Sequence, residues 1–292
     1  EQGFPVTLVE REAQLGGLSL GLHRRTSGLE SRGEANRLVE RVQANENIEV
    51  LTGCQVVRSI GFVGNFKTTV ASRGDPTQRL VEHGVTIIAT GGREYRGEQY
   101  LLGQHPAVMT MGDLEKAIWS GDPRIKQAQR IAVVQCVGPW DEQPFYCSRI
   151  CCAVTMKNTL RLKEINPSCQ VLVLHKDIRT YGIREEMYTE ARRQGAIFVR
   201  YSDDDLPTVQ AAGDGLEISF TEPSLRERLT VRADILVSSN AIVPSQGAEE
   251  LSRIFKVPLV QEGFFQEAHS KLRPVDFASD GIFLCGMAHY PK

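Results

Sequence analysis

Four of the seven cysteines gather in one short part of the sequence. They are Cys136, Cys147, Cys151 and Cys152. This clustering, with an adjacent pair, is unusual for thiols that only fill a core. Zinc sites usually draw on C-x2-4-C pairs, and adjacent thiols cannot easily both point at one small ion. An iron–sulfur cluster is wider and is held by four thiolates, so the pattern favours a 4Fe-4S cluster. A dithiol/disulfide pair is the alternative, although it leaves two of the four cysteines unexplained.

The elements around these cysteines resemble the start of a nucleotide-binding unit. An apolar strand over 130–136 ends at Cys136, and a helix over about 148–165 follows. Unpaired N–H groups and the dipole at a helix start stabilise thiolates and an anionic cluster. A dinucleotide domain normally carries G-x-G-x-x-G between such a strand and helix, but here Gly138 is followed by Pro139 and Trp140. A pyrophosphate could hardly approach this turn, so cysteines stand where cofactor phosphates would otherwise lie.

A second nucleotide-binding pattern occurs near the first residues. The strand Val6–Val9 is followed by Glu10, at the place where an acidic residue accepts hydrogen bonds from the adenosine ribose. The matching glycine loop is expected about 20 residues earlier, before the first residue of this sequence. The apolar run 84–89 leads into Thr90 and Gly91, a turn where backbone can approach a ligand closely.

The order of elements predicts the fold class. Residues 130–200 read as strand, helix, strand, helix, strand, which predicts a parallel sheet with right-handed crossovers. Three short strands and a buried strand near 235–238 follow, and a last strand over 281–286 ends at Gly286. We therefore predict an α/β protein with two Rossmann-like dinucleotide-binding domains. The first is split around the second: 1–120 and 241–292 form one domain, and 121–240 form the other.

Composition excludes several classes of protein. The chain has 292 residues, with 34 Lys and Arg against 36 Asp and Glu. A net charge of −2 gives no electrostatic reason to expect nucleic acid as a partner. The longest apolar runs have the length of strands, so no membrane span is expected. An odd number of cysteines without a secretory signal favours a reducing, cytoplasmic setting.

Several motifs resemble the A subunit of heterodisulfide reductase, over nearly the whole chain. The motifs are 131–136 with 146–152, 163–167, 177–182, 63–66, 272–276 and 281–283. The resemblance implies a thioredoxin-reductase-like core of the pyridine nucleotide-disulfide reductase type. It also implies FAD in the split domain and an iron–sulfur cluster in the second domain.

Site residues follow from this resemblance position by position. The family's cluster ligands correspond to Cys136, Cys147, Cys151 and Cys152. A helix lysine five residues after the cysteine pair, which lies near the flavin in the family, corresponds to Lys157. The implied FAD contacts are Glu10, Gly16, Gly17, Thr90, Gly91 and Gly286.

The sequence thus predicts an oxidoreductase of the heterodisulfide reductase type that carries FAD and an iron–sulfur cluster for electron transfer, with electron bifurcation as one mode open to it. Expected partners are subunits like heterodisulfide reductase B and C, a hydrogenase- or dehydrogenase-like donor module and ferredoxin, with a homodimer inside the complex. The alternatives are a stand-alone NAD(P)H-dependent disulfide reductase that uses a cysteine pair, and a non-catalytic assembly module.

Overall fold

The computed structural model describes residues 2–23, 31–72, 74, 77–140 and 145–292. The chain divides into two compact units. The first comprises 1–20, 30–93 and 243–292, and the second comprises 94–242 together with 21–29. The sequence analysis places the domain boundaries at residues 120 and 240, whereas the two compact units divide near residues 93 and 242. The predicted domain boundaries stay a prediction.

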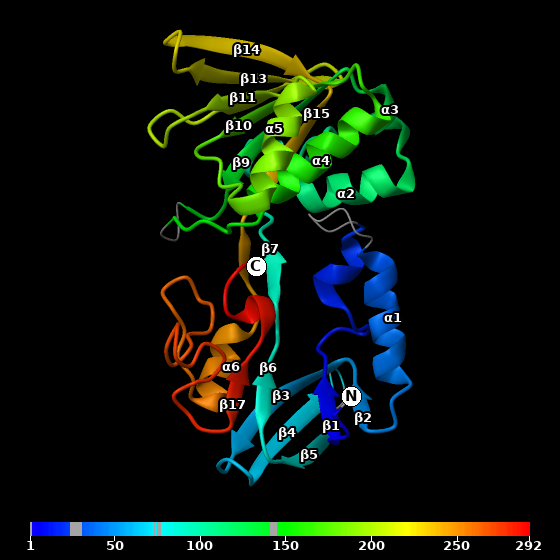
Figure 1. Cartoon of the computed structure of the whole chain (residues 1–292), viewed down its shortest axis with the longest axis vertical. Helices are drawn as coiled ribbons and strands as arrows, with labels where there is room; N and C mark the ends of the chain where they lie inside the picture. The colour runs from blue at the N-terminus through cyan, green and yellow to red at the C-terminus, as the bar shows by residue number, and fades with distance from the viewer. Residues whose placement is uncertain (1, 24–30, 73, 75–76, 141–144) are drawn as a thin grey trace. The chain divides into compact units, whose positions relative to one another are not determined.

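A five-stranded parallel sheet forms the centre of the second unit (Figure 1). Its strands, in spatial order, are β11 (Ile197–Arg200), β10 (Gln170–His175), β9 (Arg130–Val137), β15 (Ile235–Asn240) and β8 (Val108–Thr110). All neighbouring pairs are parallel. Because β9, β10 and β11 are joined through helices, this confirms the strand–helix alternation that the sequence predicts.

Two different layers cover the two faces of this sheet. Ile131 and Val133 of β9 pack with the helices, and Ala132 and Val134 pack on the other face. The helices are α2 (Met111–Ser120), α3 (Pro123–Gln127), α4 (Cys151–Ile165) and α5 (Glu185–Arg193). The opposite layer is an antiparallel sheet of β12 (Thr208–Ala212), β13 (Gly215–Glu222) and β14 (Glu227–Ala233). The period of two along β9 follows from side chains that alternate across a strand.

The first unit has its own core and smaller sheets. Parallel pairs are β1 (Val6–Val9) with β2 (Ile48–Leu51), and β6 (Thr86–Ile88) with β17 (Ile282–Leu284). An antiparallel sheet contains β3 (Cys54–Ile60), β4 (Phe66–Ser72) and β5 (Gln78–His83). Its helices are α1 (Arg32–Gln43) and α6 (Ala248–Phe255). The core gathers Phe66, Ile88, Phe265, Phe277 and Leu284.

The remaining short elements connect these parts. β7 (Gly92–Glu94) pairs with β16 (Ile242–Pro244), where the chain passes from one unit to the other. The 3-10 turns are η1 (Gly17–Gly21), η2 (Gln99–Leu101), η3 (Gly182–Arg184) and η4 (Gly286–Ala288).

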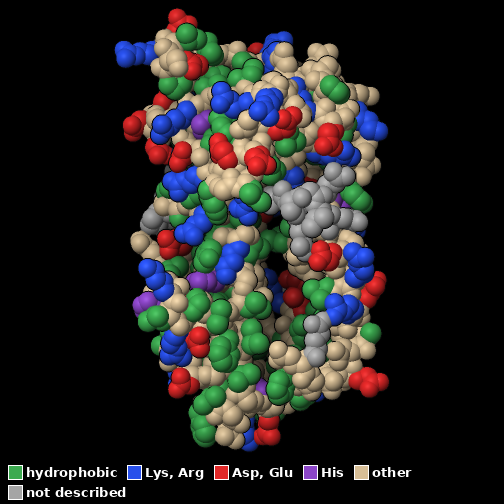
Figure 2. All heavy atoms as spheres, in the orientation of Figure 1, with side chains coloured by type: hydrophobic (Ala, Val, Ile, Leu, Met, Phe, Trp, Pro, Cys, Tyr) green, Lys and Arg blue, Asp and Glu red, His purple; other side chains and the backbone are tan. Residues whose placement is uncertain are grey.

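Charged side chains of both signs are spread over the visible surface. Figure 2 shows Lys and Arg interspersed with Asp and Glu on the visible face. Within the described ranges no helix is long and apolar enough to cross a membrane.

Helix α4 begins later than the sequence predicts. The sequence predicts a start near Ser148, but the helix begins at Cys151. Arg149 adopts a left-handed φ of 62°, which is not helical, so the helix cannot extend back through it. The Ser148 hydroxyl instead accepts a hydrogen bond from the N–H of Ile242 at 2.9 Å. Cys147 therefore precedes the helix, whereas Cys151 and Cys152 form its first turn.

Candidate metal centre and cofactor site

The end of β9 and the start of α4 bring the clustered cysteines together. Cys136 lies near the end of β9 with a φ of 61°, in the left-handed region. Such a conformation costs a residue with a β-carbon about 1–2 kcal/mol, so surrounding contacts must hold it. The Trp140 indole supplies one such contact, because its Nε1–H donates to the Cys136 carbonyl oxygen at 2.7 Å. The strain stands beside the proposed ligand, as strain at functional sites often does.

The four thiols lie close enough to change one another's ionisation. The Cys152 thiol is hydrogen-bonded to that of Cys151, and this contact, followed by burial, holds the pKa of Cys151 well above its usual value. The same contact lowers the pKa of Cys152 to about 7. Burial raises the pKa of Cys136, and the nearby Cys152 and Cys147 raise it further. The cysteines thus lie near enough to affect one another's pKa, and their role as ligands of one cluster stays a prediction.

A segment after β10 contacts three of these four cysteines. The N–H of Arg179 donates to Cys152 Sγ at 3.4 Å, and the backbone of Lys176 lies near Cys136, where it acts to lower the pKa of that thiol. The Arg179 guanidinium is held mainly by Asp177, which raises its pKa, and it also donates to the Cys147 side chain. This segment surrounds the thiols with hydrogen-bond donors.

Gly138 gives the turn after β9 its unusual shape. A β-carbon at this position would lie 2.2 Å from the Trp140 indole, so only glycine allows the ring to pack there. Trp140 also makes edge contacts with the rings of Phe145 and Tyr146. Aromatic side chains thus fill the turn that in a dinucleotide domain is left open for a pyrophosphate.

The donor set suits an iron–sulfur cluster in its chemistry. Cys151 and Cys152 lie in the first turn of a fifteen-residue helix, where N–H groups favour negative charge, and Cys147 lies just before it. Backbone donors and one guanidinium point at the sulfurs, as expected around an anionic cluster. Among the described residues, no three His, Cys, Asp or Glu side chains already have the spacing to hold a single metal ion. A wide cluster with one thiolate per iron does not require that spacing.

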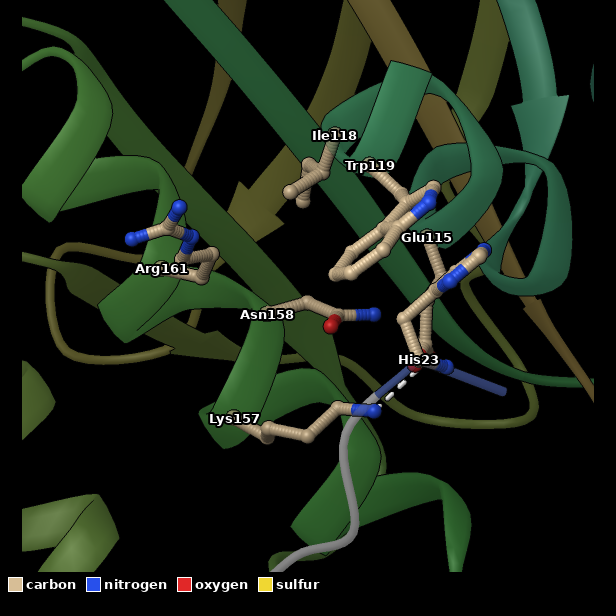
Figure 3. Close-up of a pocket in the computed structure, with 7 residues that line it drawn as sticks. All are labelled: His23, Glu115, Ile118, Trp119, Lys157, Asn158 and Arg161. Atoms are coloured by element: carbon tan, nitrogen blue, oxygen red, sulfur yellow. Dashed lines mark hydrogen bonds and ion pairs between the residues drawn. The ribbon is translucent and has the colours of Figure 1, made fainter. Parts of the chain in front are cut away.

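Lys157 lies on α4 and forms a buried ion pair, which Figure 3 shows. Its Nζ lies 2.7 Å from Glu115 Oε2, and the two side chains are only 10% and 5% exposed. The N–H of His23 donates to the other oxygen of Glu115 at 2.8 Å, and the His23 ring stacks on Trp119. The pair borders a cavity of about 230 Å³, which is also lined by Ile118, Asn158 and Arg161. The proposed place of Lys157 near a flavin stays a prediction.

Residues expected to contact FAD lie in the first unit at the ends of strands. Thr90 and Gly91 follow β6, and Gly286 follows β17. Since β6 and β17 are parallel neighbours, these residues emerge at the same edge. Gly91 and Gly286 have φ values of 70° and 65°, and a β-carbon added at either position would have no atom within 4 Å. The edge is therefore open to close approach by a ligand.

The other expected FAD contacts lie after β1. Glu10 directly follows this strand, and one of its carboxylate oxygens accepts a hydrogen bond from the N–H of Glu12 at 2.9 Å. Gly16 has a φ of 111°, and a β-carbon there would lie 2.7 Å from Leu20. Gly17 has a φ of 50° with open space beside it. At Gly16 the packing of Leu20 alone already explains the glycine, whereas Gly17 leaves room for a ligand.

Sequence reasoning missed two groups that the structure places beside the expected site. Glu115 went unnoticed because helix α2 was not predicted. The contacts of Lys176 and Arg179 went unnoticed although a signal existed: β9 and β10 are parallel neighbours, so residues after both strands meet at one edge.

No protein-family model matches the chain. It is 33% identical over 240 residues to the A subunit of the H(2):CoB-CoM heterodisulfide,ferredoxin reductase of Methanothermobacter marburgensis, covering 75% of this chain and 35% of that protein. It is 32% identical over 233 residues to the A subunit of the ferredoxin:CoB-CoM heterodisulfide reductase of Methanosarcina mazei, covering 74% and 29%. The chain spans about a third of the length of these curated relatives.

Solved structures of thioredoxin reductases share the fold. That of T. acidophilum superposes with a TM-score of 0.63 at 12% identity, covering 100% of this chain and 92% of that one. That of Lactococcus lactis gives 0.62 at 13% identity, covering 98% and 90%. These likenesses confirm the predicted α/β class with Rossmann-like domains, in a fold shared with thioredoxin reductases. Through the sequence it shares with its curated relatives, the chain belongs to the family of heterodisulfide reductase A subunits.

Proposed function

We propose that this chain is the FAD- and iron–sulfur-carrying part of an electron-transfer protein in a heterodisulfide-reductase-like complex. The observation that carries the proposal is the placement of the cysteines: Cys136 lies near the end of β9, Cys147 precedes α4, and Cys151 and Cys152 form its first turn. One segment after β10 supplies donors to three of the sulfurs. These four cysteines would hold a 4Fe-4S cluster.

FAD is proposed to bind in the first unit. Thr90, Gly91 and Gly286 offer an open edge after two parallel strands, and the glycines have room for a ligand. Glu10 follows β1 at the position from which a carboxylate accepts hydrogen bonds from ribose hydroxyls. We propose Gly16 and Gly17 as further contacts. The flavin and the cluster would supply one-electron and two-electron chemistry.

The chain's own residues control the surroundings of these groups. The N–H of Arg179 donates to Cys152 Sγ and the backbone of Lys176 lies near Cys136, and both act to lower the thiol pKa, which stabilises thiolates. The rings of Trp140 and Phe145 contact each other edge to face after β9. Glu115 holds the ammonium group of Lys157 in a fixed, buried place. If Lys157 contacts the flavin as proposed, the ion pair with Glu115 fixes the position of the Lys157 ammonium group.

The proposed partners follow from the relatives. Their names state that they belong to reductases of the CoB-CoM heterodisulfide, and some names include ferredoxin. We propose that this chain passes electrons within a cytoplasmic complex that holds subunits like heterodisulfide reductase B and C, a donor module and a second copy of this chain. The proposed final acceptor is a disulfide. Electron bifurcation is proposed only as one mode of this transfer.

Purification of the full-length protein without oxygen tests this proposal. We expect bound flavin and about four irons per chain, with an electron paramagnetic resonance signal after reduction. Reduced nicotinamide should not bind to the second unit, because Trp140 packs on Gly138 in the turn. A protein that holds neither flavin nor iron would contradict the proposal and indicate an assembly module.

A second candidate is a stand-alone disulfide reductase that uses a cysteine pair. The hydrogen bond between Cys151 and Cys152 favours it, because it lowers the pKa of Cys152 to about 7, near the optimum for thiol–disulfide exchange. This candidate predicts NAD(P)H-dependent reduction of a small disulfide without iron. Activity that survives in Cys136→Ser and Cys147→Ser, but not in Cys152→Ser, would support it over the cluster.

A further inference from the structure

We infer that the segment 176–180 between β10 and η3 raises the reduction potential of a cluster held by the four cysteines, with Arg179 as its positioning residue. This inference rests on the proposed function and names the residues that would set the reduction potential of the proposed cluster. It concerns residues that are not themselves expected ligands.

One short segment faces three of the four sulfurs. The N–H of Arg179 lies 3.4 Å from Cys152 Sγ, and the carbonyl oxygen of Asp177 lies 3.7 Å from the same sulfur. The Arg179 guanidinium reaches the Cys147 side chain, and the backbone of Lys176 lies near Cys136. Cys151 is hydrogen-bonded to Cys152 instead, and Cys147 also accepts a hydrogen bond from the N–H of Arg149 at 3.3 Å.

The segment is anchored at both ends. At its start, the Lys176 carbonyl oxygen accepts a hydrogen bond from Arg200 Nε at 2.9 Å, and the Lys176 ammonium group pairs with Asp203. At its end, Thr180 is 2% exposed and its hydroxyl donates to Glu185 Oε2 at 2.7 Å. The Arg179 Nε–H also donates to Asp177 Oδ2 at 3.1 Å, which restrains the guanidinium. The donors are therefore held in place before any electron arrives.

The backbone donors and the Arg179 guanidinium favour the reduced state of the site, whereas the Asp177 carboxylate acts against them at Cys152. When a reduced flavin gives up one electron to the site, the site gains one negative charge. Hydrogen bonds to the sulfurs and a nearby cation stabilise this more negative state, which raises the potential. The Arg179 side chain is 51% exposed, so water screens part of its effect, whereas Cys152 itself is only 2% exposed. The backbone donors, which lie closer to buried sulfur, provide the less screened part.

A redox titration of the full-length protein, followed by electron paramagnetic resonance, tests the inference. Arg179→Gln keeps the backbone N–H and removes the charge, so the ratio of reduced to oxidised cluster at a fixed potential should fall roughly threefold to tenfold, where tenfold equals about 59 mV. Arg179→Lys should restore most of the potential. Arg193→Gln removes an arginine from α5 whose side chain is 74% exposed, and it should change nothing.

A second variant tests the anchoring of the segment. Thr180→Val keeps the shape of the side chain and the charge of Arg179 but removes the hydrogen bond to Glu185. We expect a lower potential and a broader resonance signal, because the donors would no longer be held in one arrangement.

The outcomes separate this inference from the proposed function. If the wild-type protein shows no cluster signal, both are wrong. If the cluster is present but Arg179→Gln and Thr180→Val leave its potential unchanged, the inference is wrong and the proposed function stands. A shift in Arg179→Gln that Arg193→Gln reproduces would also overturn it, because any lost surface charge would then have the same effect.

Discussion

At the scale of single residues, the pair of Glu115 and Lys157 is the most demanding feature of the second unit. Two opposite charges lie 2.7 Å apart with almost no exposure to water. Desolvation of the charges is costly, and the contact between them, together with the hydrogen bond from the His23 N–H to Glu115, offsets it. The pair therefore adds little net stability but cannot be broken cheaply.

We predict that Glu115→Gln destabilises the protein by about 3 kcal/mol, because it leaves the buried Lys157 ammonium group without its carboxylate. Chemical denaturation measures this loss. The double variant Glu115→Gln with Lys157→Gln removes both charges and should cost less than Glu115→Gln alone. Equal or greater loss in the double variant would show that packing, and not charge, governs the site.

Gly138 is the second residue with a sharp prediction. Because a β-carbon would lie 2.2 Å from the Trp140 indole, Gly138→Ala should cost about 1–3 kcal/mol and shift the tryptophan fluorescence. In a protein that already carries Trp140→Ala, adding Gly138→Ala should cost little further stability, because the indole that the β-carbon would meet is absent. An unperturbed Gly138→Ala protein would contradict the described position of the indole.

At the scale of elements, most strands and helices could be predicted from the sequence. The apolar runs of β9, β10 and β15 are buried and continuous, and α4 ends at Asn166 before Pro167, where the sequence places the break. Helix α2 was missed, although Thr110 and Asp113 form a capping box at its start. Its role could not be predicted, because Glu115 meets Lys157 from 42 positions away.

The site was predictable to a similar extent. Cysteine spacing indicated that the four thiols flank one strand and one helix, and that is where they lie. The left-handed conformations of Cys136 and Arg149 could not be predicted, because residues with β-carbons rarely adopt them without tertiary contacts. The donors from 176–179 depend on the neighbouring strand, so local sequence patterns do not reveal them.

The stability that Asp113 contributes at the start of α2 should depend on pH. Burial alone would raise the pKa of Asp113, but hydrogen bonds and charge from Arg96, with help from Thr110, lower it overall. A lowered pKa stabilises the fold above the ordinary value near 4 and loses this effect as pH falls through the lowered value. Asp113→Asn should therefore cost stability, about 1 kcal/mol for the cap, at neutral pH.

Denaturation at several pH values checks this sign. The difference between wild type and Asp113→Asn should be constant above about pH 5 and should shrink below about pH 4. Asp122→Asn, at the start of the short helix α3, serves as a comparison for a cap held by its own neighbour Arg124. A difference that grows on acidification would contradict the described contacts of Asp113.

At the scale of the whole molecule, the chain has two units with separate cores. The first gathers around Phe265 and Phe277, whose rings meet edge to face at 6.0 Å. The second is built on the two faces of the parallel sheet. Each unit thus has the apolar burial that a domain needs.

We predict that a core substitution acts within its own unit. Phe277 is fully buried, so Phe277→Ala should cost about 3–5 kcal/mol of stability in the first unit. Hydrogen exchange should then speed up in β6 and β17 while β9 and β10 keep their protection. Equal acceleration in all four strands would show that the two units unfold together.

The most direct test of the account is the iron content of cysteine variants of the full-length protein, purified without oxygen. Cys147→Ser and Cys152→Ser should lose the cluster signal and most of about four irons per chain, with flavin retained. Cys169→Ser, which changes a buried cysteine of the same unit outside the site, should keep both. Retention of the full cluster in Cys147→Ser and Cys152→Ser would contradict the central claim.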